Sequence, residues 1–218
     1  SANVQTASSN DSDAEVTITG TGSQWGSTGS YYIGRNGMGL LTVEQNGMLS
    51  ATASIVLGLG PTGMGDAFVQ TGGMMVTDSQ LQVAREGSAM LTVLSHSSVT
   101  SSGLDSPTFT AGYIGGLAGS SGTMLVSGAS ARWHANGGSV VVGFGGQGTL
   151  TINSAGRVNS VGGFIGRNPG SNGAVTISGN TSLWNSTGGV SVGLGPNNAA
   201  GGTGLLTVNG QGRIFAPV

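Results

Sequence analysis

Eight carboxylates and two histidines are the side chains of this sequence that could support acid–base or metal chemistry. The acids are Asp11, Asp13, Glu15, Glu44, Asp66, Asp78, Glu86 and Asp105, and the histidines are His96 and His134. Hydrolysis of a glycosidic bond needs two carboxyl groups about 5 to 9.5 Å apart. Measured from the apolar anchors of the repeat described below, Glu44, Asp66, Asp78 and Glu86 occupy four different positions. The sequence therefore predicts no column of paired acids and no catalytic site.

Nucleophilic, metal and cofactor chemistry also lack their sequence signatures. A serine nucleophile needs a histidine and an acid beside it, and no G-x-S-x-G elbow accompanies the two isolated histidines. Because the chain has no cysteine and no paired histidines, we predict no zinc site. The stretch GFGGQG from Gly143 to Gly148 matches G-x-G-x-x-G, but similar corners recur elsewhere and none opens a helix. We interpret it as turn chemistry and expect neither an enzyme nor a bound cofactor.

Six arginines supply the positive charge, since the sequence has no lysine. Arg132, Arg157 and Arg213 each stand directly before an apolar residue of the repeat, which predicts that they share one edge of the fold. Such a basic edge could bind sulfated glycans or anionic lipid headgroups. The other three, Arg35, Arg85 and Arg167, follow a different apolar position by two residues. The alternative interpretation is that arginine is simply well solvated beside a corner.

Charge is distributed unevenly along the chain. All eight acids lie before residue 106 with two of the arginines, so that part carries −6, and the remainder carries four arginines and no acid. This asymmetry concerns partners and solubility and not the fold. Nucleic acid is disfavoured as a partner, because the sequence has no lysine and predicts no face that combines basic and aromatic residues.

The elements that must position these side chains repeat about every 25 residues. An apolar-x-apolar triplet, usually with Thr in the middle, recurs eight times, and such alternation is typical of a half-buried strand. The last residues of the triplets are Ile18, Val43, Val69, Val93, Val126, Ile152, Ile177 and Val208. A second apolar anchor, mostly followed by Gly, comes at Ile33, Leu57, Val83, Ile114, Val142, Ile165 and Val192. A third comes at Trp25, Leu49, Met75, Val99, Trp133, Val158, Trp184 and Ile214.

The repeat predicts an all-β fold, a right-handed parallel β-helix (β-solenoid) of about eight turns of roughly 25 residues. Forty-four glycines would suit a disordered chain, but 37% of the residues are hydrophobic and recur regularly, so we expect a buried core. No segment with helical periodicity and capping residues appears, which excludes helical solenoids. The hairpin turns that a β-propeller needs are also missing from the sequence, which excludes that fold. No apolar run approaches the roughly 20 residues that span a bilayer.

Two segments lengthen the repeat, and one precedes it. We expect residues 1–14 to be a polar extension and residues 15–218 to be a single β-helix domain. The stretches TSSGLDSPTFTAG and LGPNNAAGGTG add residues to their turns, and insertions in a solenoid leave it as loops where ligand contacts often lie. Asp105, Phe109 and Asn197 are therefore candidate contacts. Open strand edges at the ends of a solenoid also predict self-association.

The repeats resemble those of Gram-negative autotransporter passenger domains. The likeness covers residues 15 to 218 and rests on units such as VTITGTGSQW, YYIGRNGMGLLTVEQNGML and GGFIGRNPGSNGAVTISGNTSLW. The resemblance implies export through the periplasm and outer membrane and display at the bacterial cell surface by a C-terminal β-barrel. That barrel is not among these residues, so the chain is expected to be a fragment of a longer passenger.

Adhesion or another host-directed (virulence) role is what the resemblance implies for function. The expected partner is a host cell-surface protein or an anionic glycan, with Arg132, Arg157 and Arg213 as the candidate binding residues. Two alternatives stay open, a polysaccharide-acting β-helix enzyme of tailspike type and an inert structural spacer. An acidic pair on adjacent turns would favour the enzyme, whereas a chain that binds nothing would favour the spacer.

Overall fold

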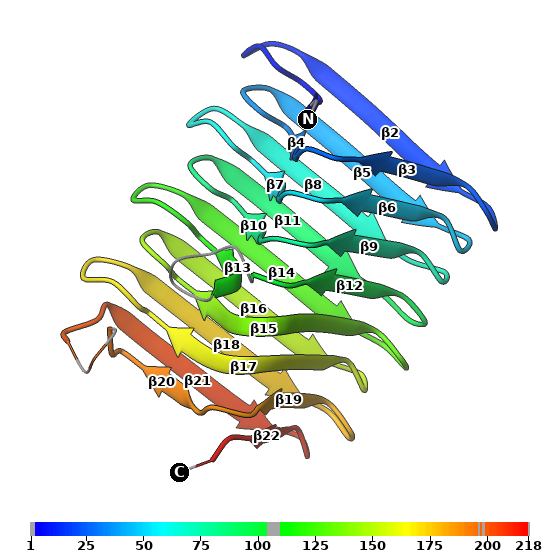
Figure 1. Ribbon diagram of the computed structural model, residues 1–218. Coiled ribbons are helices and arrows are strands. Elements are labelled where there is room, and N and C mark those ends of the chain that lie inside the picture. Colours follow the sequence, from blue (N-terminus) through cyan, green and yellow to red (C-terminus); the bar gives the residue numbers. More distant parts are fainter. Residues whose placement is uncertain (1–2, 104–109, 196, 198, 218) are drawn as a thin grey trace.

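Parallel strands make up the regular structure of the computed structural model, which describes residues 3–103, 110–195, 197 and 199–217. The strands form one sheet of 8 strands and one of 14. Every pairing between named strands is parallel and joins one turn to the next. The turns stack into a rod with the two termini at opposite ends (Figure 1). The predicted parallel β-solenoid of about eight turns is confirmed.

The 8-stranded sheet contains the Thr-centred triplets, one strand from each turn. Its strands are β2 (Asp13–Thr19), β5 (Met38–Glu44), β8 (Met64–Val69), β11 (Ser88–Val93), β14 (Ser121–Ser127), β16 (Gln147–Asn153), β18 (Asn172–Ser178) and β21 (Thr203–Asn209). The eight predicted triplet anchors pair with one another from Ile18 to Val208 without a slip of register. Register is held because a one-residue slip would turn every apolar side chain to solvent.

The 14-stranded sheet consists of two columns that meet in two long strands. One column contains β3 (Gln24–Ser27), β6 (Met48–Ala51), β9 (Met74–Thr77), β12 (Ser98–Ser101), β19 (Leu183–Ser186) and β22 (Arg213–Phe215). The other contains β1 (Val4–Gln5), β4 (Tyr31–Ile33), β7 (Ile55–Leu57), β10 (Leu81–Val83), β13 (Thr110–Ile114) and β20 (Val190–Val192). The strands β15 (Arg132–Val142) and β17 (Arg157–Ile165) run through both columns.

Apolar side chains from all three columns fill the interior of the solenoid. The second anchors pair in register from Ile33 to Val192, and the third anchors pair from Trp25 to Ile214, as the repeat predicts. Trp133 and Trp184 are the largest of the fully buried side chains. Burial of such side chains is the main favourable term in the stability of a chain without disulfides.

The N-terminal segment predicted to be a polar extension contributes to the solenoid. Val4 and Gln5 form β1, which pairs in parallel with β4, and Thr6 and Ala7 are buried. The hydroxyl of Thr6 accepts a hydrogen bond from the amide of Gly34, 3.2 Å away. The strand β1 therefore adds one strand to the column that contains β4. The strand β2 begins at Asp13, which also lies inside the predicted extension.

Among the described residues, no helix is long and apolar enough to cross a membrane.

Candidate functional site

Arg132, Arg157 and Arg213 lie in one outward-facing column of the 14-stranded sheet, and all three side chains are exposed. Arg132 pairs directly with Arg157, which pairs with Leu183, which in turn pairs with Arg213. Because neighbouring strands are about 4.8 Å apart, the column rises about 14 Å from the first arginine to the last. We call this column, Arg132, Arg157, Leu183 and Arg213, the basic strip.

The outward direction of the strip follows from strand alternation. Trp133, Val158 and Ile214 come directly after the three arginines and face the core, the first two with no exposed surface. Successive side chains of a strand point to opposite faces, so the residue before each anchor must face solvent. The predicted grouping of the three arginines on one edge therefore follows from the buried third anchors.

A second outward column accompanies the basic strip two residues further along each strand. It contains His134, Asn159 and Asn185, which pair in register. The amide Nδ2 of Asn159 lies 3.3 Å from Nδ1 of His134. Burial, and to a smaller extent the charge of Arg132, lowers the pKa of His134 below its usual value. The neutral ring can thus accept from Asn159 through Nδ1, which leaves Nε2–H as a donor.

Sequence analysis named His134 only as an isolated histidine and did not select Asn159 or Asn185, although the repeat predicts the position of all three. Each stands one residue after a third anchor, at Trp133, Val158 and Trp184. Strand alternation places such residues on the face of the strip. Together the two columns form a surface of guanidinium, imidazole and amide donors that can bind an anionic, hydroxyl-bearing ligand.

The remaining candidate contacts do not join this surface. Asp105 and Phe109 lie outside the described residues. Asn197 is exposed, with a positive φ of 55°, in the connection between β20 and β21 beside an antiparallel bridge from Leu194 to Ala200. That corner precedes β21, whereas Arg213 follows β21, so the two lie at opposite ends of this strand.

The acids include one pair that the sequence interpretation missed. Glu15 and Asp66 share an outward column of the 8-stranded sheet, with Leu40 between them, so the statement that no column repeats an acid is wrong. The error arose because Glu15 was not compared with its anchor: Glu15 precedes Ile18 by three residues, as Asp66 precedes Val69. Oδ1 of Asp66 accepts a hydrogen bond from the amide of Met90, 3.0 Å away. This bond gives Asp66 a structural role.

Metal-binding geometry is not assembled by the part of the chain that the structure describes. No three His, Asp or Glu side chains gather there in a group that could hold a metal ion.

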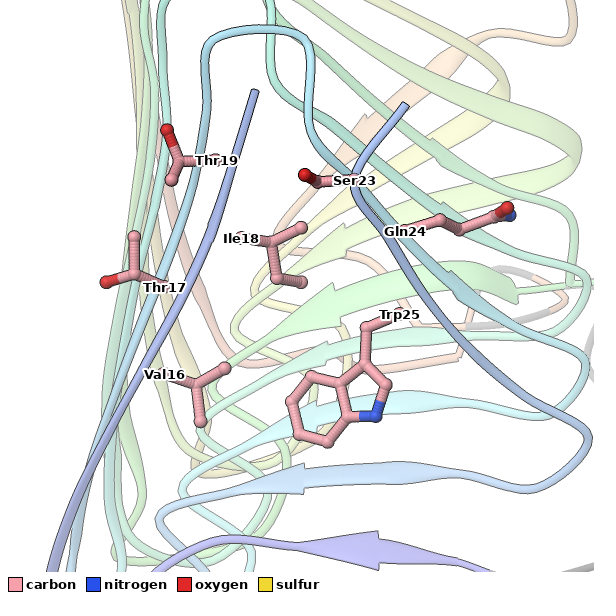
Figure 2. A pocket seen from close by; sticks show the side chains of 7 residues that line it. All are labelled: Val16, Thr17, Ile18, Thr19, Ser23, Gln24 and Trp25. Atoms are coloured by element: carbon pink, nitrogen blue, oxygen red, sulfur yellow. The ribbon is translucent and has the colours of Figure 1, made fainter. Parts of the chain in front are cut away.

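The side chains that line a hollow at the N-terminal end of the solenoid include no ionisable group. Val16 and Ile18 from β2 point toward Trp25 from β3, while Thr17 and Thr19 point away from the hollow (Figure 2). The indole of Trp25 packs edge-on against Tyr31, with ring centroids 4.9 Å apart. Val16, Ile18 and Trp25 give the hollow its apolar lining, which supplies no acid or base.

Arg167 occupies a site that sequence analysis described as a solvated corner. Its side chain is only 6% exposed, and its guanidinium lies 5.2 Å from the ring centre of Phe144 and 5.0 Å from that of Phe164. Its Nη1 donates to Oγ1 of Thr110, 3.3 Å away, whereas its buried Nε has no partner. Burial lowers the pKa of this guanidinium. The guanidinium thus contacts two rings, and its bond to Thr110 ties the end of β17 to the start of β13.

A double-mutant cycle on Arg167→Met and Phe164→Leu tests this clamp. Cation–π contacts of desolvated groups reach about 2 kcal/mol, so we expect a coupling energy of about 1 to 2 kcal/mol in the free energy of unfolding. Urea denaturation followed by circular dichroism measures the four stabilities. A coupling below about 0.3 kcal/mol would show that the rings and the cation contribute independently.

Comparison with known proteins does not assign the chain to a family. No protein-family model matches the sequence, and no curated protein matches it. A solved structure that does match is the crystal structure of a TibC-catalysed hyper-glycosylated fragment of TibA, at 14% sequence identity and a TM-score of 0.18, covering 97% of this chain and 93% of that one. Because the identity and the TM-score are this low, we infer neither a function nor a fold from this match.

Proposed function

We propose that this solenoid is the non-catalytic binding part of a secreted or surface-displayed protein of the autotransporter type, and that it acts as an adhesin or host-interaction module. The observation that carries the proposal is the basic strip, in which three exposed arginines follow one column of a stacked sheet. A rigid parallel sheet holds these side chains at fixed spacing without ordering a loop. The resemblance of the repeats to autotransporter passengers supports the location outside the cell.

Binding of the labelled chain to cultured host cells tests the proposal. We expect saturable binding that the triple variant Arg132→Ala, Arg157→Ala, Arg213→Ala largely loses, because the strip then has no charge. The control is Thr151→Ala, Thr176→Ala, Thr207→Ala, which changes three consecutive strands on the outer face of the other sheet. Light scattering of each sample fixes the oligomeric state, since the predicted self-association would raise avidity.

Three outcomes would contradict the proposal. Binding that does not saturate would show that the chain adheres without a site. Equal binding by the arginine and threonine variants would show that the basic strip does not contribute to adhesion. The absence of any binding to cells would favour the alternative of an inert spacer.

A further inference from the structure

We propose that the basic strip binds a linear sulfated polysaccharide that lies along the solenoid axis, an inference that rests on the proposed binding function and names its ligand. Arg132 and Arg157 are exposed and directly paired on neighbouring strands, and Arg213 continues the same column beyond Leu183. The cations therefore form a line along the axis, about 14 Å long. A chain with anionic groups at regular intervals is the complement of such a line.

Electrostatic repulsion within the strip favours an anion. Like charges that face each other on adjacent strands destabilise a sheet, and Arg132 and Arg157 are such a pair. No acid follows Asp105 in the sequence, so β15, β17, β19 and β22 contain no carboxylate that could neutralise them. A bound sulfate would relieve this repulsion and accept charge-assisted hydrogen bonds from both guanidiniums.

The column beside the strip suits the uncharged part of a polysaccharide. His134, Asn159 and Asn185 face the same side as the arginines and are partly exposed. Their imidazole and amide groups both donate and accept hydrogen bonds, as sugar hydroxyls do. A ligand along the axis would thus meet cations on one side and neutral polar groups on the other.

Other polyanions fit this surface less well. Recognition of an anionic membrane uses clusters of about 4 to 8 basic residues, and the strip has three. Single-stranded nucleic acid is bound by stacking of its bases on aromatic side chains. Of Phe, Tyr and Trp, these two columns from β15 to β22 contain only Phe215, on the last strand. Both ligands are nevertheless arms of the test.

Heparin is the probe, and the intact chain is titrated onto immobilised heparin and, in parallel, onto unsulfated dextran, phosphatidylserine vesicles and single-stranded DNA. We expect binding to heparin alone, weakening steadily as sodium chloride is added, because ion pairs are screened. The variant Arg132→Gln, Arg157→Gln should bind at least about tenfold more weakly. The matched control Arg35→Gln, Arg85→Gln removes the same charge from the acidic half and should change the affinity less than about twofold. Circular dichroism melts confirm that each variant keeps its fold.

Several results would overturn the inference. Equal loss in the two glutamine variants would show that net charge alone matters, and equal affinity for heparin, phosphatidylserine vesicles and single-stranded DNA would show that no polysaccharide is recognised. Retained cell binding after enzymatic removal of sulfated glycans would refute the ligand and leave the proposed adhesion intact. Conversely, heparin binding without any binding to cells would support this ligand chemistry and count against adhesion.

Discussion

Trp133→Ala is expected to lower the free energy of unfolding by about 3 to 5 kcal/mol, the usual cost of removing a large buried side chain from a core. The indole has no exposed surface and is among the largest buried side chains of the solenoid. Its Nε1–H donates to Oγ of Ser101 on the preceding turn, 3.0 Å away. The substitution would therefore open a cavity between turns and leave the Ser101 hydroxyl without its donor. Urea denaturation followed by far-ultraviolet circular dichroism measures the change.

Trp25 provides a matched control for this prediction. It belongs to the same in-register column as Trp133 but lies in the first turn, where its side chain is only partly buried. Trp25→Ala should thus cost clearly less than Trp133→Ala, since the apolar area that it returns to water is smaller. Trp133→Phe keeps much of the ring volume and should fall between the two. Equal costs for Trp25→Ala and Trp133→Ala would contradict the account of core packing.

Stacking explains why the fold could be predicted from the sequence. In a parallel solenoid each position of one turn pairs with the same position of the next turn. The period of the sequence therefore predicts which residues pair. Ile18, Trp25 and Ile33 were each assigned to a column from spacing alone, and all three columns pair as assigned. The basic strip was predicted for the same reason, because Arg132 and Arg157 occupy equal positions in consecutive turns.

Burial on the outer surface could not be predicted in this way. Strand alternation assigns Val141 to the outside, yet it is as completely buried as Val140 and Val142 on either side. The same limit hid Arg167, whose two aromatic partners, Phe144 and Phe164, come from different turns. Periodicity reports which side a residue faces, whereas burial depends on what lies over that side. The repeat also does not predict that β15 and β17 each run through both columns as one continuous strand, because this depends on the local backbone geometry at a corner.

The second large effect on the free energy of unfolding is expected at a corner, at the residue that follows each second anchor. All seven residues there have positive φ, and six are glycine: Gly34, Gly58, Ala84, Gly115, Gly143, Gly166 and Gly193. At Gly143, with φ 73°, a Cβ would lie 2.5 Å from the carbonyl oxygen of Asn172 and 2.7 Å from the amide of Gly173 on the next turn. At Gly143 the next turn therefore leaves no room for a side chain.

Gly143→Ala is therefore expected to destabilise the protein by more than the left-handed strain of about 1 to 2 kcal/mol, since the backbone of the next turn must also move. The loss is measured by urea denaturation against the unchanged chain. A cost below about 0.5 kcal/mol would mean that the corner is not tight and that glycine is there for another reason.

Ala84→Gly makes the reverse change at the one turn that lacks the glycine, where Ala84 has a φ of 59°. Relief of left-handed strain favours glycine, while the greater freedom of glycine in the unfolded chain opposes it by about 0.5 to 1 kcal/mol. The net expectation is a gain of up to about 1 kcal/mol. This corner also has Ala89 where the neighbouring strands have Gly65 and Gly122, so two alanines replace two glycines that pack together elsewhere. Urea denaturation against the unchanged chain measures the gain, and a loss of stability in Ala84→Gly would show that packing of the Ala84 methyl outweighs its left-handed strain.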